Sequence, residues 1–360
     1  MLSLANEVCR VFTVRYVILL SLLPGMMTGV YSPQIHADQQ QTSTALVKTI
    51  TSPWPHTNFA DNLRYSIDAS SRPIYFSHRD ELGFQHALGL DLHKVFSGER
   101  GDISTLLVQG YLTRIDNLPQ RPSFFDDDDT EFVYRIFNIN YTGFKGKLPN
   151  VKVGHFEIPF GLEHIINTNG TLRDYNNGRK LGLKADWGVT LNKELPTLEY
   201  EVSASSGGGQ KFDSQDGSYV YAARLGTLRN QDQVYGVSLY KAEVGGVKRQ
   251  YLGLDAQWYC GLQGFFAEIS GGDNDSIEVV NTLLEWNIRN RSEAYLTYLQ
   301  LLGFAQKIDG DWQDNVAAVV GLRYVPEAHW SFSGQLKRDV SVFDGAFRET
   351  TASLQIRYRW

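Results

Sequence analysis

The chain ends in Leu354-Gln355-Ile356-Arg357-Tyr358-Arg359-Trp360, where apolar and polar side chains alternate strictly. A period of two is typical of a strand whose two faces lie in different surroundings. In a transmembrane β-barrel one face of each strand lies in lipid, the other lines the lumen, and aromatic side chains gather at the membrane interfaces. The apolar row consists of Leu354, Ile356, Tyr358 and Trp360, and the polar row of Ser353, Gln355, Arg357 and Arg359. We therefore predict a closing barrel strand; a half-buried C-terminal strand of a soluble sheet is the alternative.

The first 37 residues predict a secretory signal peptide. Arg10 and Arg15 precede an apolar run over 16–23, which Pro24-Gly25 interrupts, and Ala37 is a small residue before a plausible cleavage point. A charged start, a short apolar run and a small residue at the cut are the parts of such a signal. The apolar run is shorter than the roughly 18–20 residues that a spanning helix needs. A transmembrane anchor is the alternative.

Composition excludes several function classes. The chain has 360 residues and a formal net charge of −6, which argues against a general nucleic-acid binder. Its two cysteines, Cys9 and Cys260, lie in neither a CxxCH haem motif nor a Cys-based zinc motif. We expect no cofactor and no bound metal. The 19 Tyr and 19 Phe suit the aromatic girdles of a membrane barrel.

Strand patterns fill the chain after a polar leader at 38–60. Residues 252–258, for example, place Leu252, Leu254 and Trp258 on one face and Asp255 on the other. We predict an all-β, antiparallel up-and-down transmembrane β-barrel over 61–360, with about 16 strands. The strands are expected to start near Leu63, Phe84, Ile103, Phe132, Val151, Lys180, Thr197, Ser218, Val234, Arg249, Leu262, Glu278, Glu293, Val316, Trp330 and Thr350.

The connections between these strands supply a second test. Trp360 would end the last strand on the periplasmic side, where bacterial barrels keep short turns, whereas longer loops lie outside. Counted backward from this end, the two kinds of connection should alternate. We expect periplasmic turns at 326–329, 290–292 and 147–150, and external loops at 340–349, 304–315 and 116–130.

The longest connection, 156–179, would be the third external loop, and the residues leading into it form a motif. The string Gly154-His155-Phe156-Glu157-Ile158-Pro159-Phe160-Gly161-Leu162-Glu163 resembles the GxFxxPFGLE stretch of the phosphate-selective (O/P type) porin-like family. Pro159 cannot donate to a sheet ladder and would end the strand, and Gly161 permits a chain reversal. A long surface loop with ordinary stop signals is the alternative.

This resemblance implies a trimeric, anion-preferring channel that is narrowed by the third external loop folding inward. The constriction would then contain Glu157, Glu163, His164, Arg173, Arg179 and Lys180, and the pore wall Lys184, Arg323, Arg357 and Arg359. Cationic side chains would attract anions, and the two glutamates would shape the field. Because acidic and basic residues are mixed on the predicted luminal rows, we expect a weakly selective, water-filled pore.

We predict a porin-like channel in a Gram-negative outer membrane, through which small hydrophilic solutes or ions diffuse. Enzymatic activity is not expected, because the chain has no GxSxG, HExxH or P-loop string. Its partners would be outer-membrane lipid and lipopolysaccharide, further copies in a homotrimer, and the barrel-assembly machinery, which would read Tyr358 and Trp360. The alternatives are a barrel sheath or scaffold around a periplasmic or secreted partner, such as an electron-transfer protein, and a specific organic-nutrient uptake channel.

Overall fold

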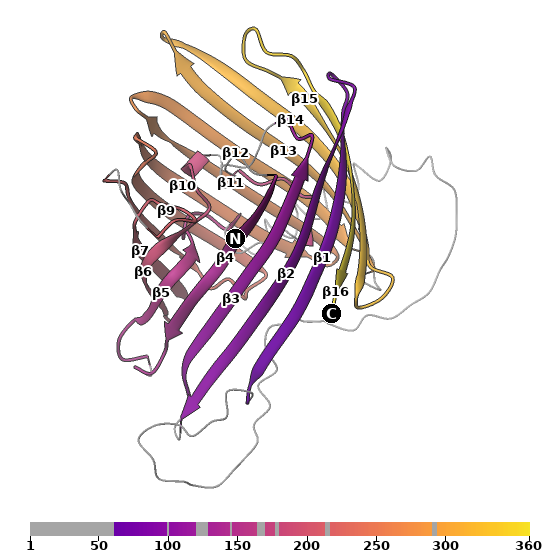
Figure 1. Cartoon of the computed structure of the whole chain (residues 1–360). Helices are drawn as coiled ribbons and strands as arrows, with labels where there is room; N and C mark the ends of the chain where they lie inside the picture. The colour runs from indigo at the N-terminus through magenta and orange to yellow at the C-terminus, as the bar shows by residue number, and fades with distance from the viewer. Residues whose placement is uncertain are drawn as a thin grey trace. The chain divides into compact units, whose positions relative to one another are not determined.

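A computed structural model describes residues 61–98, 101–119, 129–144, 146–163, 170–176, 180–212, 217–289 and 294–360. These residues form one closed barrel of sixteen antiparallel strands, each paired with its neighbours in sequence. Figure 1 shows the strands running from β1 in indigo to β16 in yellow, which lie side by side where the sheet closes. The predicted fold class is confirmed. The predicted signal peptide at 1–37 and leader at 38–60 lie outside the described residues.

All sixteen predicted strand starts fall within five residues of an observed one. The strands are β1 (Leu63–Phe76), β2 (Glu81–Gly98), β3 (Gly101–Asp116), β4 (Thr130–Tyr141), β5 (Asn150–Glu157), β6 (Ala185–Glu194), β7 (Leu198–Ser205), β8 (Tyr219–Thr227), β9 (Gln233–Val244), β10 (Val247–Cys260), β11 (Gln263–Asn274), β12 (Ile277–Arg289), β13 (Tyr295–Ile308), β14 (Asp311–Tyr324), β15 (Trp330–Ser341) and β16 (Thr350–Arg359). Within these residues, no helix is long and apolar enough to span a membrane.

The C-terminal strand closes the barrel against β1, as its alternation predicts. The backbone of Trp360 exchanges two hydrogen bonds with that of Ile67, at 2.8 and 2.9 Å, and its ring lies 5.6 Å from that of Tyr65. Leu354 is 63% exposed on the outer face, whereas Gln355 is 2% exposed on the inner face. The predicted facing of the two rows is therefore confirmed.

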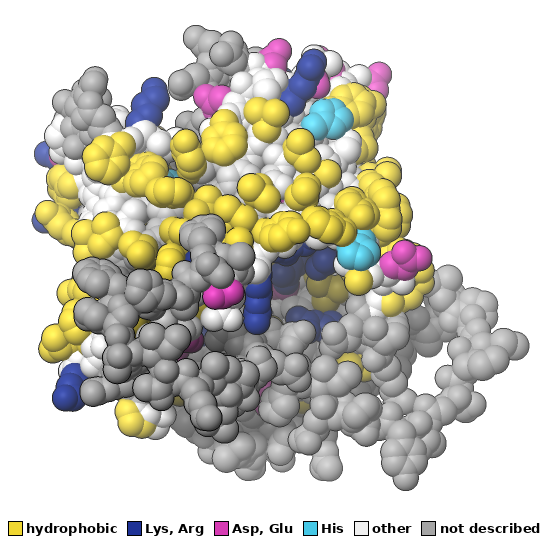
Figure 2. Space-filling view, turned by 60° about the horizontal axis from the view of Figure 1, so that its bottom comes forward, with side chains coloured by type: hydrophobic (Ala, Val, Ile, Leu, Met, Phe, Trp, Pro, Cys, Tyr) yellow, Lys and Arg dark blue, Asp and Glu magenta, His cyan; other side chains and the backbone are white. Residues whose placement is uncertain are grey.

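Apolar side chains cover the outside of the barrel. Figure 2 shows them as a broad band across the face in view, with Lys and Arg side chains visible in the hollow beside it. Leucine, valine, isoleucine and aromatic residues on successive strands stay exposed, while the alternate positions are buried and largely polar. An apolar exterior around a polar interior is the arrangement that a lipid bilayer stabilises, so the barrel is of the transmembrane type.

The predicted external loop at 304–315 is wrong. β13 and β14 continue to a two-residue turn at Asp309 and Gly310, whose φ values of 52° and 93° are those that a tight hairpin turn requires. The connections β9–β10 and β11–β12, at the same end, are also two residues long. With up to 14 residues, these strands are longer than the 9–11 residues that cross a bilayer, so the hairpins extend past the apolar band.

The sixth strand also begins later than predicted. Leu181 and Leu183 alternate in phase with β6, but both are buried in an apolar cluster inside the barrel, and β6 starts at Ala185. Gly182, between them, has a φ of 83°, which directs the chain off the strand.

The β7–β8 connection completes the barrel wall beside β4, because β5 is shorter than β4. β4 pairs with β5 only over Phe137–Tyr141, so the backbone of Tyr134 lacks a strand neighbour on that side. The side chain of Gln210, from the β7–β8 connection, accepts from the Tyr134 amide and donates to its carbonyl, both at 2.7 Å. Asp186 holds this connection by accepting from the amides of Gly207 and Gly209. The β7–β8 connection thus covers an edge that would otherwise be unpaired.

Candidate functional site

The functional candidate is the β5–β6 segment, by which we mean the described residues 158–163, 170–176 and 180–184. The strand before it carries Gly154, at a φ of 127°, where a Cβ would lie 2.2 Å from the Phe137 carbonyl oxygen. Only glycine fits this position. Pro159, which has no N–H to donate, follows the end of β5 at Glu157.

Phe160 anchors the beginning of the segment. Its ring is 0% exposed and lies 6.1 Å from that of Tyr240 on β9 and 6.5 Å from that of Tyr251 on β10. The Tyr240 hydroxyl donates to the Leu181 carbonyl at 2.8 Å, which ties the end of the segment to the same wall. Burial of a phenylalanine contributes about 1.5–3 kcal/mol, so this ring is a strong attachment point.

Leu162 anchors the segment a second time. It packs in a separate cluster with Phe266 of β11, Leu283 of β12 and Tyr298 of β13. Backbone groups between the two anchors are also satisfied by the wall, because Gly161 donates to Ser238 Oγ at 2.9 Å and Leu162 to Glu268 Oε2 at 3.0 Å. The segment thus lies against the inner faces of β9 to β13.

Lys180 links the end of the segment to Glu163, near its beginning, and to Glu268 on the barrel wall. Its ammonium group pairs with Glu268 of β11 and lies 3.7 Å from Glu163, and all three side chains are almost completely buried. Burial alone lowers the pKa of Lys180, but the two carboxylates raise it more, so its pKa lies above the ordinary value. Lys180 is therefore charged at neutral pH. The three side chains Lys180, Glu163 and Glu268 are called the buried triad below.

The second half of the segment reaches other strands. Arg173 pairs with Glu285 of β12 at 2.7 Å, and Asp174 pairs with Lys337 of β15 at 2.9 Å. The Asp174 backbone exchanges two hydrogen bonds with the side chain of Gln300 on β13, each 3.0 Å long. Arg72 of β1 donates to the Thr171 carbonyl at 3.1 Å. The connection between β5 and β6 therefore makes contacts with strands as far around the barrel as β15 and β1.

The predicted constriction residues have different surroundings. Glu157 accepts from Arg135 at 3.1 Å and pairs with Lys184 at 3.4 Å. Arg173 forms an ion pair with Glu285. Lys180 is 3% exposed, and the carboxylates of Glu163 and Glu268 beside it are also buried. His164 and Arg179 lie outside the described residues.

Three of the predicted wall residues lie on strands. Arg323 is on β14, and Arg357 and Arg359 are on β16, with β15 between these two strands; Lys184 lies just before β6. Arg357 donates to Asp68 Oδ1 at 2.8 Å, and Arg359 pairs with Asp91 at 2.9 Å. Arg323, on β14, has no carboxylate partner among the described residues, and its Nε is buried without a hydrogen bond. It lies within electrostatic reach of three other arginines, namely Arg357, Arg173 and Arg289. We call these four side chains the arginine cluster.

Sequence reasoning missed several residues that hold the segment. Glu268, Ser238 and Gln300 all contact it, yet none was among the predicted site residues. Alternation places Glu268 on the inner row, between Phe266 and Ser270, so the sequence predicts that its side chain points into the barrel. The pairing with Lys180 could not be predicted, because Lys180 and Glu268 are 88 residues apart in sequence and meet only when the segment folds against the wall.

Gly161 offers a direct test of this packing. At its φ of 65°, a Cβ would lie 2.0 Å from Glu268 Oε2, so Gly161→Ala brings both backbone strain and a steric overlap with the buried triad. We expect a barrel that still folds, with a segment that is cleaved faster by protease between β5 and β6. The matched control is Gly245→Ala, at a similar φ of 58° but with open space around it. Equal cleavage of the two variants would contradict the close packing at Gly161.

Comparison with known proteins gives a result for the fold. No protein-family model matches the chain, and no curated protein matches it. Several solved structures do match the chain. The outer membrane channel DcaP of Acinetobacter baumannii is 13% identical, with a TM-score of 0.60, and the match covers 83% of this chain and 97% of that one.

Two further barrels match to the same extent. OprB of Pseudomonas putida is 10% identical, with a TM-score of 0.63 over 83% of this chain and 94% of that one. The anion-selective porin from Comamonas acidovorans is 11% identical, with a TM-score of 0.59 over 83% and 99%. At such identities the likeness establishes the fold, which is that of outer-membrane porins and channels.

Proposed function

We propose that this protein is a porin-like channel of the bacterial outer membrane, through which small hydrophilic solutes and ions diffuse, with a preference for anions. The observation that carries the preference is the arginine cluster, in which Arg323 lies within electrostatic reach of three other guanidinium groups and has no carboxylate ion-pair partner among the described residues. A cation without a counter-charge in a lumen attracts an anion most strongly where water is restricted.

The mixture of charges in the lumen supports this preference once the ion pairs are known. Within the described residues, most acidic side chains of the inner face are paired with cations: Asp68 with Arg357, Asp91 with Arg359, Glu157 with Arg135 and Lys184, Asp174 with Lys337, Glu199 and Glu201 with Arg229, Asp255 with Arg224, and Glu285 with Arg173. Glu163 and Glu268 share Lys180, and Asp186 accepts hydrogen bonds from backbone amides. Most of the negative charge is therefore compensated locally. Arg323 and Arg289 belong to none of these pairs, so their positive charges are not compensated by them.

The identity of the anion is a finer part of the proposal. The resemblance of 154–163 to phosphate-selective porins makes inorganic phosphate the first solute to test. The likeness to an anion-selective porin from Comamonas acidovorans supports the broader class. Because part of the wall is lined by paired charges of both signs, we propose weak selection among small anions, with chloride as well as phosphate passing.

The assembly of the protein belongs to the same proposal. Residues 1–37 direct export, 38–60 form a periplasmic leader, and the C-terminal strand with Tyr358 and Trp360 is read by the barrel-assembly machinery. A homotrimer is proposed, and one similar solved structure, OmpT of Vibrio cholerae, is described as a trimer form. Lipid and lipopolysaccharide would surround the apolar band.

Two alternatives are disfavoured by particular contacts. A sheath around a partner protein needs an empty lumen, whereas residues 158–163 and 170–176 are bonded to the inner faces of several strands. A dedicated nutrient channel would use exposed luminal aromatics as a track, but Tyr240 and Tyr251 are buried under Phe160.

Single-channel recording tests the proposal. The refolded protein is inserted into a planar bilayer, the reversal potential is measured under a KCl gradient, and phosphate is then added. We expect open steps with an anion-directed reversal potential and partial block by phosphate. Cation preference would overturn the role of the arginine cluster. A folded barrel that gives no steps would overturn the open channel and favour the sheath.

A further inference from the structure

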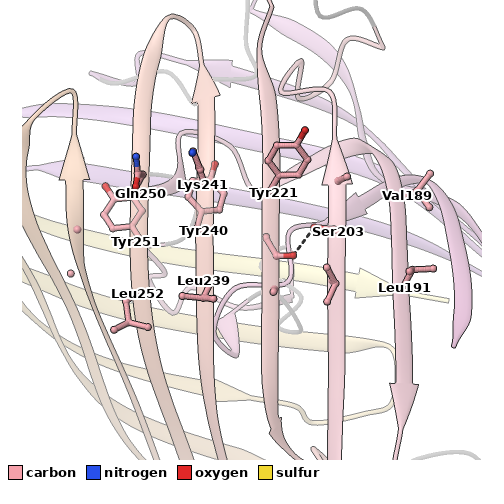
Figure 3. A pocket seen from close by; sticks show the side chains of 16 residues that line it. Val189, Leu191, Ser203, Tyr221, Leu239, Tyr240, Lys241, Gln250, Tyr251 and Leu252 are labelled. Carbon is pink, nitrogen blue, oxygen red and sulfur yellow. Dashed lines mark hydrogen bonds between the residues drawn. The ribbon is translucent and has the colours of Figure 1, made fainter.

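The outer wall carries a shallow apolar groove that plays no part in the proposed channel. It runs over β6 to β11 and has a volume of about 730 Å³, within the range of small-molecule sites. Exposed, outward-facing side chains such as Leu191, Leu239 and Leu252 line it (Figure 3). Small residues lie between them, namely Ala204, Ala223 and Gly271. The inward-facing residues Tyr240 and Tyr251 of the same strands also border it.

The groove results from the strand register. Ala223 faces Leu239 across one strand pair, Leu239 faces Leu252 across the next, and Leu252 faces Gly271 across the third. Large side chains in the middle of this row thus stand between positions with little or no side chain. A hollow of this kind on a lipid-facing wall accepts flexible hydrocarbon chains, because they bend to fill it.

Polar side chains border the groove on the side of the β9–β10 turn. Lys241 faces Gln250 on β10 and Tyr221 on β8, one outward position beyond Leu239 and Leu252. Figure 3 shows the labelled side chains of these three residues above those of the two leucines. On β9 the outward apolar row ends at Leu239 and Lys241 is the first polar residue after it, which places this border at the edge of the apolar band.

The charge of Lys241 is not matched locally. No described residue forms an ion pair with it. Glu243, two residues further on the same face, lies opposite Lys248 in the register. Asp273 lies opposite Gln250 and is therefore two strands from Lys241, about 10 Å away at the usual strand spacing. A lysine stem lying on an apolar surface with its ammonium at the interface is arranged to meet an anionic headgroup.

We propose that the groove binds a phosphate-bearing membrane lipid, with acyl chains on Leu239 and Leu252 and the phosphate on Lys241. The Tyr221 hydroxyl and the Gln250 amide are additional donors beside it. Charge complementarity therefore selects the lipid.

Native mass spectrometry of the folded barrel in detergent tests this assignment, with dioleoyl phosphatidylglycerol as the probe and dioleoyl phosphatidylcholine for comparison. We expect retention of phosphatidylglycerol, and binding about fivefold weaker in Lys241→Gln, as expected for the loss of one interfacial lysine. The matched control is Lys193→Gln, an outward lysine near the other end of the same wall. Ala223→Trp fills the floor of the groove and should abolish retention of both lipids.

Each result is decisive once heat-modifiable migration on gels confirms that the variants are folded. Wild-type affinity in both Lys241→Gln and Ala223→Trp would overturn the proposal. So would a change of oligomeric state in Ala223→Trp without any change in lipid retention, since the groove would then be an interface between copies. Equal losses in Lys241→Gln and Lys193→Gln would reduce the effect to general surface charge and would also overturn it.

Discussion

Replacing Lys180 with methionine is expected to detach the β5–β6 segment from the inner wall and to raise the single-channel conductance. Glu163 and Glu268 would remain buried beside each other without their shared cation. Removal of one partner from a buried ion pair costs about 3–5 kcal/mol, because an uncompensated charge is left in place. The segment can avoid that cost by moving the Glu163 carboxylate into water. The measurements are the mean conductance and the rate of proteolysis between β5 and β6.

Two further variants separate this effect from a general loss of stability. The triple variant Lys180→Met, Glu163→Gln and Glu268→Gln removes all three charges and should restore most of the wild-type conductance, since neutral side chains of similar shape tolerate burial. Lys307→Met breaks an exposed pair with Glu278, which is worth about 0–1 kcal/mol, and should leave the conductance unchanged. Wild-type conductance in Lys180→Met would show that the buried triad does not hold the segment.

The wall of this barrel was predictable because its two faces lie in different solvents. Lipid outside and water inside impose a period of two on every strand, and the facing of Leu354 and Gln355 follows from it. The same contrast disappears beyond the bilayer. Residues 304–315 alternate poorly because the β13–β14 hairpin extends past the apolar band, so their sequence predicts a loop.

The interior was less predictable, for a different physical reason. Leu181 and Leu183 alternate like lipid-facing residues, yet they pack inside against Phe160 and Tyr240. Burial against a lumen segment and burial in lipid require the same apolar side chains, so a pattern cannot distinguish the two. Pro159 and Gly161, which interrupt the strand pattern, predict where the segment begins. Its attachment points cannot be predicted in this way, because they lie on strands that follow much later in the chain.

Ion pairing changes what a list of luminal charges predicts about selectivity. Counted from sequence, the lumen is mixed. In the structure, Glu157 is shared by two cations, Asp68 is bound by Arg357, and Arg323 has no acidic partner among the described residues. The charge that a passing ion meets is what remains after these pairs form. Sequence places each residue on a face, but the remainder depends on contacts across strands and with the β5–β6 segment.

Reversing the charge at Arg323 is therefore expected to convert an anion-preferring pore into one that prefers cations. Two unit charges about 4 Å apart interact by about 1 kcal/mol even at the dielectric constant of water, and more strongly in a confined lumen. Arg323→Glu changes the local charge by two, which disfavours chloride and favours potassium by about 2 kcal/mol each, so the chloride-to-potassium permeability ratio should fall by at least roughly thirtyfold. Arg323→Gln should give an intermediate ratio. The reversal potential under a KCl gradient measures both.

The location of the charge, and not only its sign, carries this expectation. Arg348 is exposed in the connection between β15 and β16, away from the arginine cluster, so Arg348→Glu makes the same chemical change without altering the lumen. Its permeability ratio should stay close to that of the wild type at about 0.1 M salt, where exposed charges are screened over about 10 Å. If Arg348→Glu and Arg323→Glu shifted the reversal potential equally, the preference would come from the overall charge of the protein. A shift confined to Arg323→Glu, with Arg323→Gln between it and the wild type, would locate the selectivity at the arginine cluster.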